Sequence, residues 1–168
     1  MKISMHQASA PRFANILRNL SSILDKAQAH AEAKKIDPLA LTQFRLYPDM
    51  FPLTRQVQIA CDTAKGAVAR LAGVEIPKHE DTEQTFPELK ARIANTVKFI
   101  ESIGAAKVDG TEDKEIVLKM RAQEIKFNGL QYLMGFAIPN FFFHVTTAYN
   151  ILRHNGVELG KPDFVGTP

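Results

Sequence analysis

Apolar residues recur at steps of three and four along four stretches of this chain, which is the spacing of an amphipathic helix and not of a strand. The stretches run from Ser9 to Lys35, from Pro52 to Gly73, from Thr85 to Gly104 and from Pro139 to Asn155. In the first stretch, for example, Leu17, Leu20 and Leu24 fall on one face of the helix. The hydrophobic pattern therefore predicts four long helices.

Residues at the ends of these stretches agree with the pattern. Thr85 and Glu88 have the spacing of a capping box, in which each side chain satisfies the free backbone N–H of the other residue. A proline at the first position of a helix needs no hydrogen-bond donor, and a glycine commonly follows the last turn. Pro52 and Gly73 suit these two positions at the ends of the second predicted helix.

The segments between the predicted helices differ from one another. Residues 36–50 contain Pro38 and Pro48, which favour extended backbone before them, so we expect a long crossover there. Residues 115–128 partly alternate apolar and polar side chains and predict a small β-hairpin. The last dozen residues are rich in glycine and proline, and we expect an irregular tail.

Together these elements predict an all-α four-helix bundle, with the long crossover between helices one and two and the hairpin between helices three and four. A chain of 168 residues is long enough to bury one substantial core. We therefore expect a single domain over residues 1–168.

Composition limits the expected cellular location and binding partners of the domain. Cys61 is the single cysteine, so no disulfide framework can form, and a reducing cytoplasm is the expected location. No apolar run has the length of a signal peptide or a membrane-spanning helix, so no membrane partner is expected. The formal net charge of +3 is scattered, with Lys34-Lys35 as the longest basic run, and nucleic acid is not an expected partner.

His144 is the first candidate for chemistry, because it follows three consecutive phenylalanines within a predicted helix. A buried imidazole needs a partner, since an unsatisfied buried polar group costs about 1–3 kcal/mol. Asn140 lies one turn before it on the same face, and Gln58 and Asp62 lie one turn apart on the second helix. If these two helices are neighbours, Gln58, Asp62, Asn140 and His144 form a candidate ligand-binding cluster inside the bundle.

Three stretches of the chain resemble a known superfamily: "MHQASAPRFANILRNLSSILDKAQAHA", "RLYPDMFPLTRQVQIACDTAKGAVARLAG" and "HVTTAYNILRHNGVELGKPDF". They are similar to an uncharacterised bacterial branch of the DinB/YfiT-like superfamily, over essentially the whole chain. The resemblance implies an up-down-down-up four-helix bundle. It assigns no reaction, because members of that branch are domains of unknown function.

The wider superfamily commonly holds a divalent metal with three histidines, one on the second helix and two on the fourth, ahead of a Leu-Arg-x-x-Gly motif. Residues 152–156 match that motif, which places His144 and Asn140 at the fourth-helix positions, and "QIACDTA" places Gln58 at the second-helix position. One histidine of three is therefore kept. Amide oxygens are weak ligands for zinc or nickel, so we expect no metal cofactor. The alternative is a divalent metal on His144, Asn140 and Gln58, with Asp62 as a possible carboxylate ligand.

Three functions are compatible with these observations. The first is binding of a small molecule at the Gln58, Asp62, Asn140 and His144 cluster. The second is a DinB-type transferase or hydrolase that uses a metal, or a direct Asp62–His144 hydrogen bond that raises the pKa of the histidine for acid–base catalysis. The third is a structural or stress-associated dimer without a ligand.

A homodimer is the expected assembly. Phe141, Phe142 and Phe143 point about 100° apart around one helix, so they cannot share a face. At least one of them is expected to contact a neighbouring helix, the hairpin or a second subunit.

Overall fold

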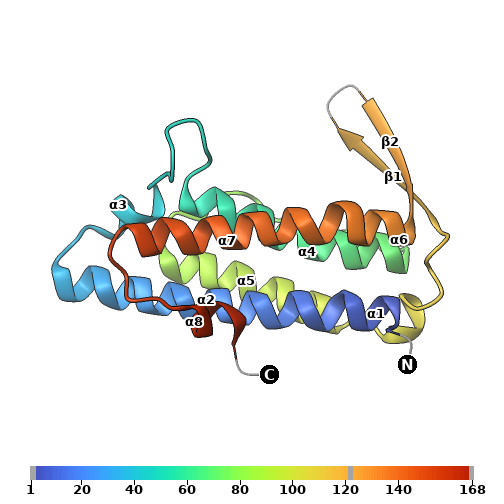
Figure 1. Cartoon of the computed structure of the whole chain (residues 1–168), viewed down its shortest axis with the longest axis horizontal. Helices are drawn as coiled ribbons and strands as arrows, with labels where there is room; N and C mark the ends of the chain where they lie inside the picture. Colours follow the sequence, from blue (N-terminus) through green and yellow to red (C-terminus); the bar gives the residue numbers. More distant parts are fainter. Residues whose placement is uncertain (1–2, 121–122, 167–168) are drawn as a thin grey trace.

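A computed structural model describes residues 3–120 and 123–166 of the chain. Its four long helices, α2 (Ala10–Lys34), α4 (Leu53–Ala72), α5 (Phe86–Glu101) and α7 (Ile138–His154), lie along one common axis (Figure 1). Helices α2 and α7 run in one direction, and α4 and α5 run in the other. The all-α four-helix bundle predicted from the sequence is confirmed, in its up-down-down-up form.

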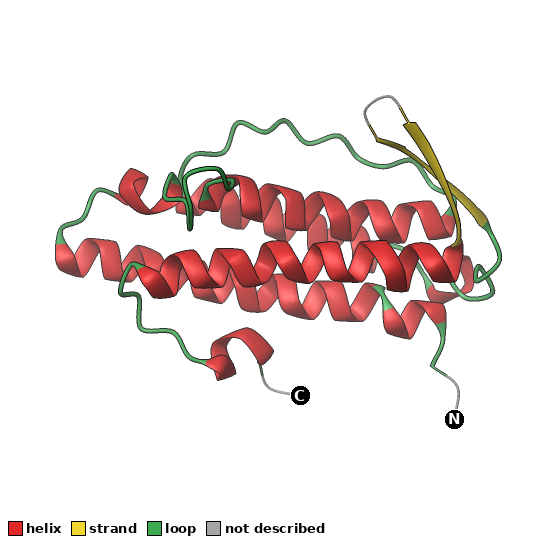
Figure 2. Cartoon of the chain, turned by 45° about the horizontal axis from the view of Figure 1, so that its top comes forward, coloured by secondary structure: helices red, strands yellow, loops and turns green. Residues whose placement is uncertain are grey.

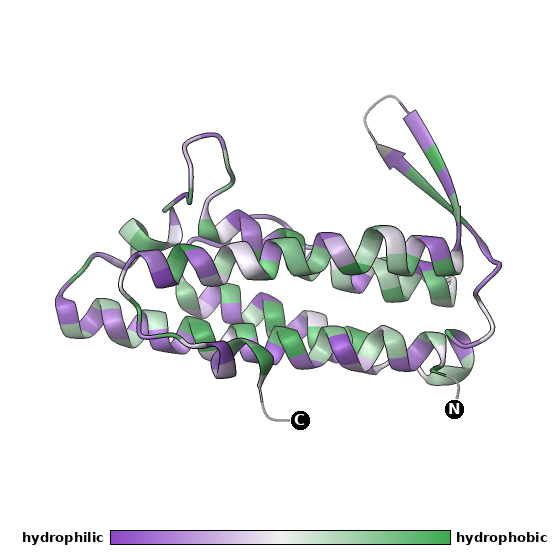
Figure 3. Ribbon diagram, in the orientation of Figure 1, coloured by the Kyte–Doolittle hydropathy of each residue, from purple (hydrophilic) through white to green (hydrophobic). Residues whose placement is uncertain are grey.

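The core lies between the four helices, because each turns its apolar stripe inward (Figure 3). Phe13 of α2 packs edge-on against Phe141 of α7, with 4.8 Å between the ring centroids. Both rings are almost fully buried, and burial of one such side chain contributes about 1.5–3 kcal/mol. Among the described residues, no helix is long and apolar enough to cross a membrane.

The capping box at Thr85 and the glycine at the end of α4 are confirmed, whereas Pro52 is the N-cap of α4 and not its first residue. The backbone N–H of Glu88 donates to Thr85 Oγ1 at 3.4 Å, and the backbone N–H of Thr85 donates to a Glu88 carboxylate oxygen at 2.9 Å. Gly73 follows α4 in the left-handed region, with φ of 69°, which a residue with a side chain adopts only at a cost.

The two long connections have different roles. Residues 35–52, which include the short helix α3 (Pro38–Thr42), join the antiparallel helices α2 and α4 at one end of the bundle. Residues 73–85 instead run along the length of the bundle (Figure 2), and we call them the return segment. The chain has to travel this way because α4 and α5 point in the same direction. The segment that crosses the bundle is therefore the one between α4 and α5, and not 36–50.

The predicted hairpin is present and projects from one end of the bundle (Figure 1). Strand β1 (Glu115–Met120) pairs antiparallel with β2 (Gln123–Asn128), in a register that places Ile116 opposite Phe127. Ile116 and Leu118 of β1 are buried against the bundle, whereas β2 is largely exposed. Two short turns, α1 (Met5–Ala8) and η1 (Ala105–Lys107), complete this end.

The last long helix is the end of a longer helical run. It starts as α6 (Gly129–Tyr132), continues through one π-helical turn, η2 (Leu133–Ala137), and runs into α7 without a break. Asn128 caps it, since its side chain accepts from the backbone N–H of Gln131. The prediction that Pro139 opens α7 is confirmed, because the proline lies in the first turn of that helix.

The expectation of an irregular tail is wrong. Residues Lys161–Val165 form a short helix, α8, which packs along α2 (Figure 1). The Asp163 carboxylate accepts from the backbone N–H of Gly160 at 2.8 Å and pairs with Lys26 of α2 at 2.6 Å. Phe164 lies 6.4 Å from the ring of Phe142, so the tail covers one of the three consecutive phenylalanines.

Candidate functional site

His144 lies in the interface between α7 and α4, and its partner is Gln56. The residue is 7% exposed, and its Nδ1 lies 2.7 Å from Gln56 Oε1. The orientation of the Gln56 amide is fixed, because its Nε2 donates to the backbone carbonyl of Phe51 at 3.0 Å. The oxygen therefore faces the imidazole, and the network assigns the ring proton to Nδ1. This arrangement leaves Nε2 of His144 as a hydrogen-bond acceptor.

The histidine is neutral at physiological pH. Burial, followed by the nearby positive charge of Arg55, lowers the pKa of His144 to about 4. The alternative in which an Asp62–His144 hydrogen bond raises this pKa is wrong, because Asp62 pairs with Arg92 and Lys65 instead.

Asn140 lies one turn before His144 and also bonds to α4. Its Nδ2 donates to Thr63 Oγ1 at 3.0 Å. Gln56, Thr63, Asn140 and His144 thus form two cross-helix hydrogen bonds between uncharged side chains, and we call these four residues the α4–α7 seam. The two α7 positions named from the sequence do meet α4, but they meet Gln56 and Thr63.

Gln58 and Asp62 bond instead toward α5 and the return segment. Gln58 Nε2 donates to Glu83 at 3.0 Å, and Gln58 Oε1 accepts from Arg55 at 3.2 Å. Asp62 accepts from Arg92 at 2.8 Å and pairs with Lys65 at 2.8 Å. Hydrogen bonding therefore divides the predicted cluster of four residues into two pairs, one in the α4–α7 seam and one outside it.

Arg92 of α5 is the centre of these charged contacts. Its side chain is 1% exposed, and it reaches Asp62, Asp81 and Glu83 at distances between 2.8 and 3.0 Å. Burial disfavours the charge, but the carboxylates of Asp62 and Glu83 outweigh burial, so the pKa of Arg92 is raised. We call the following set the charged network: Arg55, Gln58, Asp62, Lys65, Asp81, Glu83 and Arg92. It holds the return segment onto α4 and α5.

His79 of the return segment lies at the edge of the charged network. Its Nδ1 is buried and has no hydrogen-bond partner within residues 3–120 and 123–166. Burial, followed by the positive charges of Lys65 and Arg92, lowers the pKa of His79. The lowered pKa favours the neutral form of this imidazole.

The side chains do not fit the metal that the wider superfamily commonly holds. Within the described part of the chain, no three His, Cys, Asp or Glu side chains gather closely enough to hold a metal ion. His144 offers Nε2 alone, and both ends of the Gln58 amide are bound to charged side chains. Burial raises the pKa of Cys61 to about 12, so it supplies no thiolate. Zinc and nickel sites need several imidazole, thiolate or carboxylate donors, and this set lacks them.

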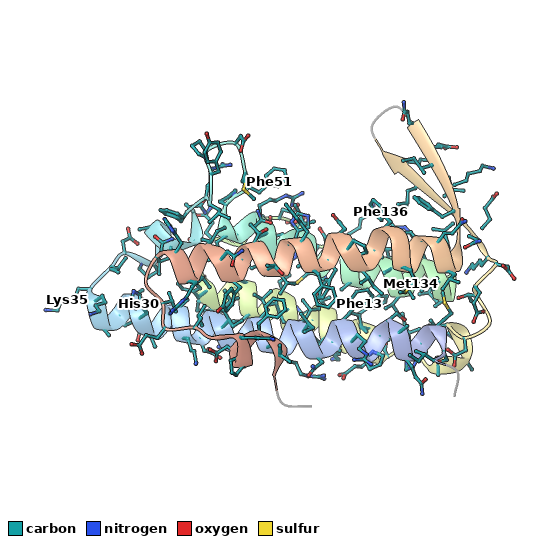
Figure 4. All side chains as sticks on the ribbon, viewed as in Figure 1. Phe13, His30, Lys35, Phe51, Met134 and Phe136 are labelled. Carbon is teal, nitrogen blue, oxygen red and sulfur yellow. The ribbon has the colours of Figure 1, made fainter. Side chains whose placement is uncertain are left out.

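The outer face of α4 borders two hollows. The first, which we call the hairpin hollow, measures about 490 Å³ and lies between α4, β1 and the α6–η2 turn. Its lining residues are Asp62, Thr63, Arg70, Val117, Leu118, Lys119, Tyr132 and Phe136. Phe136 lies on the helix below the hairpin (Figure 4). The second, the return hollow, measures about 610 Å³, lies between α4 and residues 76–80, and shares Asp62 and Arg70 with the first.

A third hollow lies elsewhere and contains none of the predicted site residues. It is a groove of about 520 Å³ between α2 and α5, and the exposed Arg18–Glu101 ion pair is part of its lining. No histidine is among its described lining residues. The hairpin hollow is the stronger candidate site because it combines apolar walls with convergent polar groups from three elements.

Sequence reasoning missed Gln56, Arg70 and Arg92. Arg92 had a detectable signal, because it interrupts the buried stripe of its helix three residues after Leu89. An arginine at such a position is either exposed by a distorted helix or paired inside the protein. Gln56 and Arg70 had no comparable signal.

The fold defines this chain as a DinB-like four-helix-bundle domain. The model of a domain of unknown function, DUF1993, matches residues 5–165, and the chain belongs to that family. The chain is also similar to a DinB family member protein from Shewanella denitrificans, whose crystal structure matches with 43% sequence identity and a TM-score of 0.88. That match covers 97% of this chain and 92% of the other. No curated protein matches the chain. The resemblance stated from the sequence is confirmed.

Proposed function

We propose that this domain binds a small molecule in the hairpin hollow, as a bacterial cytoplasmic protein without a metal cofactor. The observation that carries the proposal is the composition of the hollow. Asp62 and Arg70 of α4 converge there with the Thr63 hydroxyl, and Val117 and Phe136 supply apolar walls. A volume of about 490 Å³ lies within the range of roughly 300–1,000 Å³ that small-molecule sites occupy.

The π-helical turn supports the same location. Turns of this kind inside longer helices are rare, and they often mark functional sites. Here η2 carries Phe136 at the hollow, next to Tyr132, whose ring is stacked on Phe136 at an interplanar angle of 20°. Asp62 and, through Thr63, Asn140 connect the hollow to the cluster expected from the sequence.

The geometry favours binding over the enzymatic alternative. A hydrolase or transferase built on His144 and Asp62 needs the two side chains to meet, and each is bonded to other residues. His144 also has a pKa of about 4, which makes it a weak general base at neutral pH.

The test is a screen of a metabolite library by ligand-observed NMR, with two variants of the hairpin. Val117→Trp fills the hollow without removing a polar group. Ile125→Trp is the matched control, since Ile125 and Val117 are 37% and 39% exposed and Ile125 does not line the hollow. We expect a compound that binds the wild type and Ile125→Trp but not Val117→Trp. Absence of any such compound would overturn the proposal.

A second experiment tests the proposal that the domain has no metal cofactor. Untagged protein is analysed for its elements, and its melting temperature is measured with zinc, nickel, manganese and EDTA. We expect no stoichiometric transition metal and no shift on adding EDTA, because the seam offers one imidazole nitrogen. A bound metal whose removal lowers the melting temperature would contradict this part and favour the enzymatic alternative.

A further inference from the structure

We propose that the molecule bound in the hairpin hollow is a small organic anion whose acidic group pairs with Arg70. This inference rests on the proposed function, because it assigns the chemical class of the ligand of that site. Four properties of the surroundings of Arg70 carry it.

The first property is the absence of a carboxylate partner. Arg70 is half-buried, and within residues 3–120 and 123–166 it forms no ion pair, unlike Arg92 and Arg55 in the charged network next to it. Its one side-chain hydrogen bond runs from Nη1 to the Tyr132 hydroxyl at 3.0 Å. The other guanidinium N–H groups are left for a ligand, and carboxylates and phosphates match their planar geometry.

The second property is that Arg70 is held in place before any ligand arrives. Its Cζ lies 5.9 Å from the centroid of the Tyr132 ring, and Tyr132 is 2% exposed and stacked on Phe136. A side chain ordered in this way loses little rotamer freedom on binding, which favours affinity.

The third property is the glycine one turn earlier. Gly66 lies inside α4, where a glycine is less favourable than alanine. A Cβ at this position would lie 2.5 Å from Arg70 Nη1, and the three nearest side-chain atoms around it all belong to the Arg70 guanidinium. Gly66 therefore leaves room for the Arg70 guanidinium to lie along the helix. This gives a physical reason for a glycine in the middle of α4.

The fourth property is the balance of charge. Of the residues that the structure describes, Asp62 is the one carboxylate lining the hairpin hollow, and Arg92 and Lys65 already neutralise it. Arg70 and Lys119 are the cations of the same hollow, and Lys119 has an exposed partner, Glu124, at 3.4 Å. The field in the hollow is therefore positive, and the apolar walls at Val117 and Phe136 favour a ligand with an apolar body.

The experiment uses phenyl phosphate, benzoate, the neutral analogue benzamide, and inorganic phosphate. Each is titrated to several millimolar into the isotope-labelled full chain, with amide shifts of the hollow residues as the readout. We expect phenyl phosphate and benzoate to bind about tenfold more tightly than benzamide, since a hydrogen bond to a charged group is roughly twice as strong as a neutral one. Inorganic phosphate is expected to bind more weakly than phenyl phosphate.

Three variants locate the effect. Arg70→Gln is expected to weaken binding of benzoate about tenfold or more. Gly66→Ala is expected to weaken it as well, by displacing the guanidinium, while the melting temperature stays the same or rises. Arg12→Gln removes an exposed arginine of α2, which contributes nothing to the hollow, and is expected to leave binding unchanged.

The outcomes separate the two proposals. Benzamide that binds the hollow as tightly as benzoate, or Arg70→Gln with unchanged benzoate affinity, would overturn the anion assignment and leave the binding site standing. Inorganic phosphate that binds as tightly as phenyl phosphate would overturn the assignment of an organic ligand. No shift at the hollow with any probe overturns the anion assignment, and the library screen with Val117→Trp then decides the site itself.

Discussion

Helix α4 has two polar faces that differ in charge. The face toward α7 carries the α4–α7 seam, in which neutral side chains form single hydrogen bonds, from His144 to Gln56 and from Asn140 to Thr63. The opposite polar face carries the charged network around Arg92. An unpaired charge is far more costly inside a protein than an unpaired amide. The comparison indicates that the network fixes the return segment in place, whereas the seam mainly orients its side chains.

Arg92→Ala should have the largest effect on stability. It leaves Glu83, which is 13% exposed, and Asp62 without their buried cation, so we expect the free energy of unfolding to fall by about 3 kcal/mol or more. Urea denaturation measures it, with the exposed Arg12→Ala as control, where we expect a change below about 0.5 kcal/mol. Equal urea midpoints for the two variants would show that the network does not stabilise the fold.

A change of pH tests the seam. In the folded protein the pKa of His144 is about 4, below its ordinary value. Between pH 6.5 and 4 the histidine is therefore protonated in the unfolded chain but not in the folded chain. Stability should therefore fall as the pH falls, by about 2 to 3 kcal/mol between pH 7 and 4.5 from this residue.

The measurement is urea denaturation at both pH values, with and without His144→Gln. The variant should lose this part of the pH dependence. The pKa of His79 is also lowered, so His79 too makes stability fall as the pH falls. His79→Gln is therefore the control that removes this second contribution. If wild type and His144→Gln lose stability in parallel, His144 is not the neutral buried group described here.

Gln56→Glu would make the seam resemble the network. A carboxylate in place of the amide that lies 2.7 Å from Nδ1 should favour the imidazolium, and we expect the pKa of His144 to rise by about 1 or more. An NMR titration of the His144 ring protons measures it. Gln58→Glu is the matched control on the other face of α4 and should move this pKa less. A larger change from Gln58→Glu would show that the sequence-based pairing of Gln58 with His144 is the correct one.

The Asn140–Thr63 bond should contribute less. Asn140→Ala and Thr63→Val are each expected to lower the free energy of unfolding by about 1 kcal/mol. A double-mutant cycle isolates the bond, and the double variant should lose less than the sum of the single changes. Strict additivity would mean that the two side chains do not interact.

Phe143→Ser is expected to change stability least, by less than about 0.5 kcal/mol, because Phe143 is 56% exposed. It tests the homodimer predicted from the sequence, which stays a prediction. Sedimentation velocity of the wild type should show a dimer, and the variant should shift it toward monomer. A wild-type protein that sediments as a monomer would contradict the homodimer.

Local signals predicted much of the fold. The capping box at Thr85 and Glu88, the left-handed Gly73 and the hairpin over 115–128 depend on residues close together in the chain, and the structure has all three. The missed helix α8 has such a signal too, in the proline and aspartate at its first turn. However, contacts to α2 hold this helix in place, and a pattern of five residues does not predict such contacts.

The candidate site was predictable only in part. The sequence placed Asn140 and His144 on one face of the last helix, and they do share it. It paired them with Gln58 and Asp62, whereas Gln56 is the partner of His144 and Thr63 is the partner of Asn140. These two glutamines are separated by about 200° around the helix, at roughly 100° per residue, so the choice between them depends on the rotation of α4 about its axis.

The sequence by itself determined that this chain forms amphipathic helices, where they are capped, and to which superfamily it belongs, because these depend on periodicity and local motifs. The tertiary structure decided the rotation of α4 that brings Gln56 to His144, since nearly every residue from Ala64 to Leu71 is buried, the polar Lys65 included. It likewise decided that Arg92 meets the acids of the return segment and that Arg70 has no such partner. Contacts between residues far apart in the chain follow from packing all the helices at once, and no local pattern contains them.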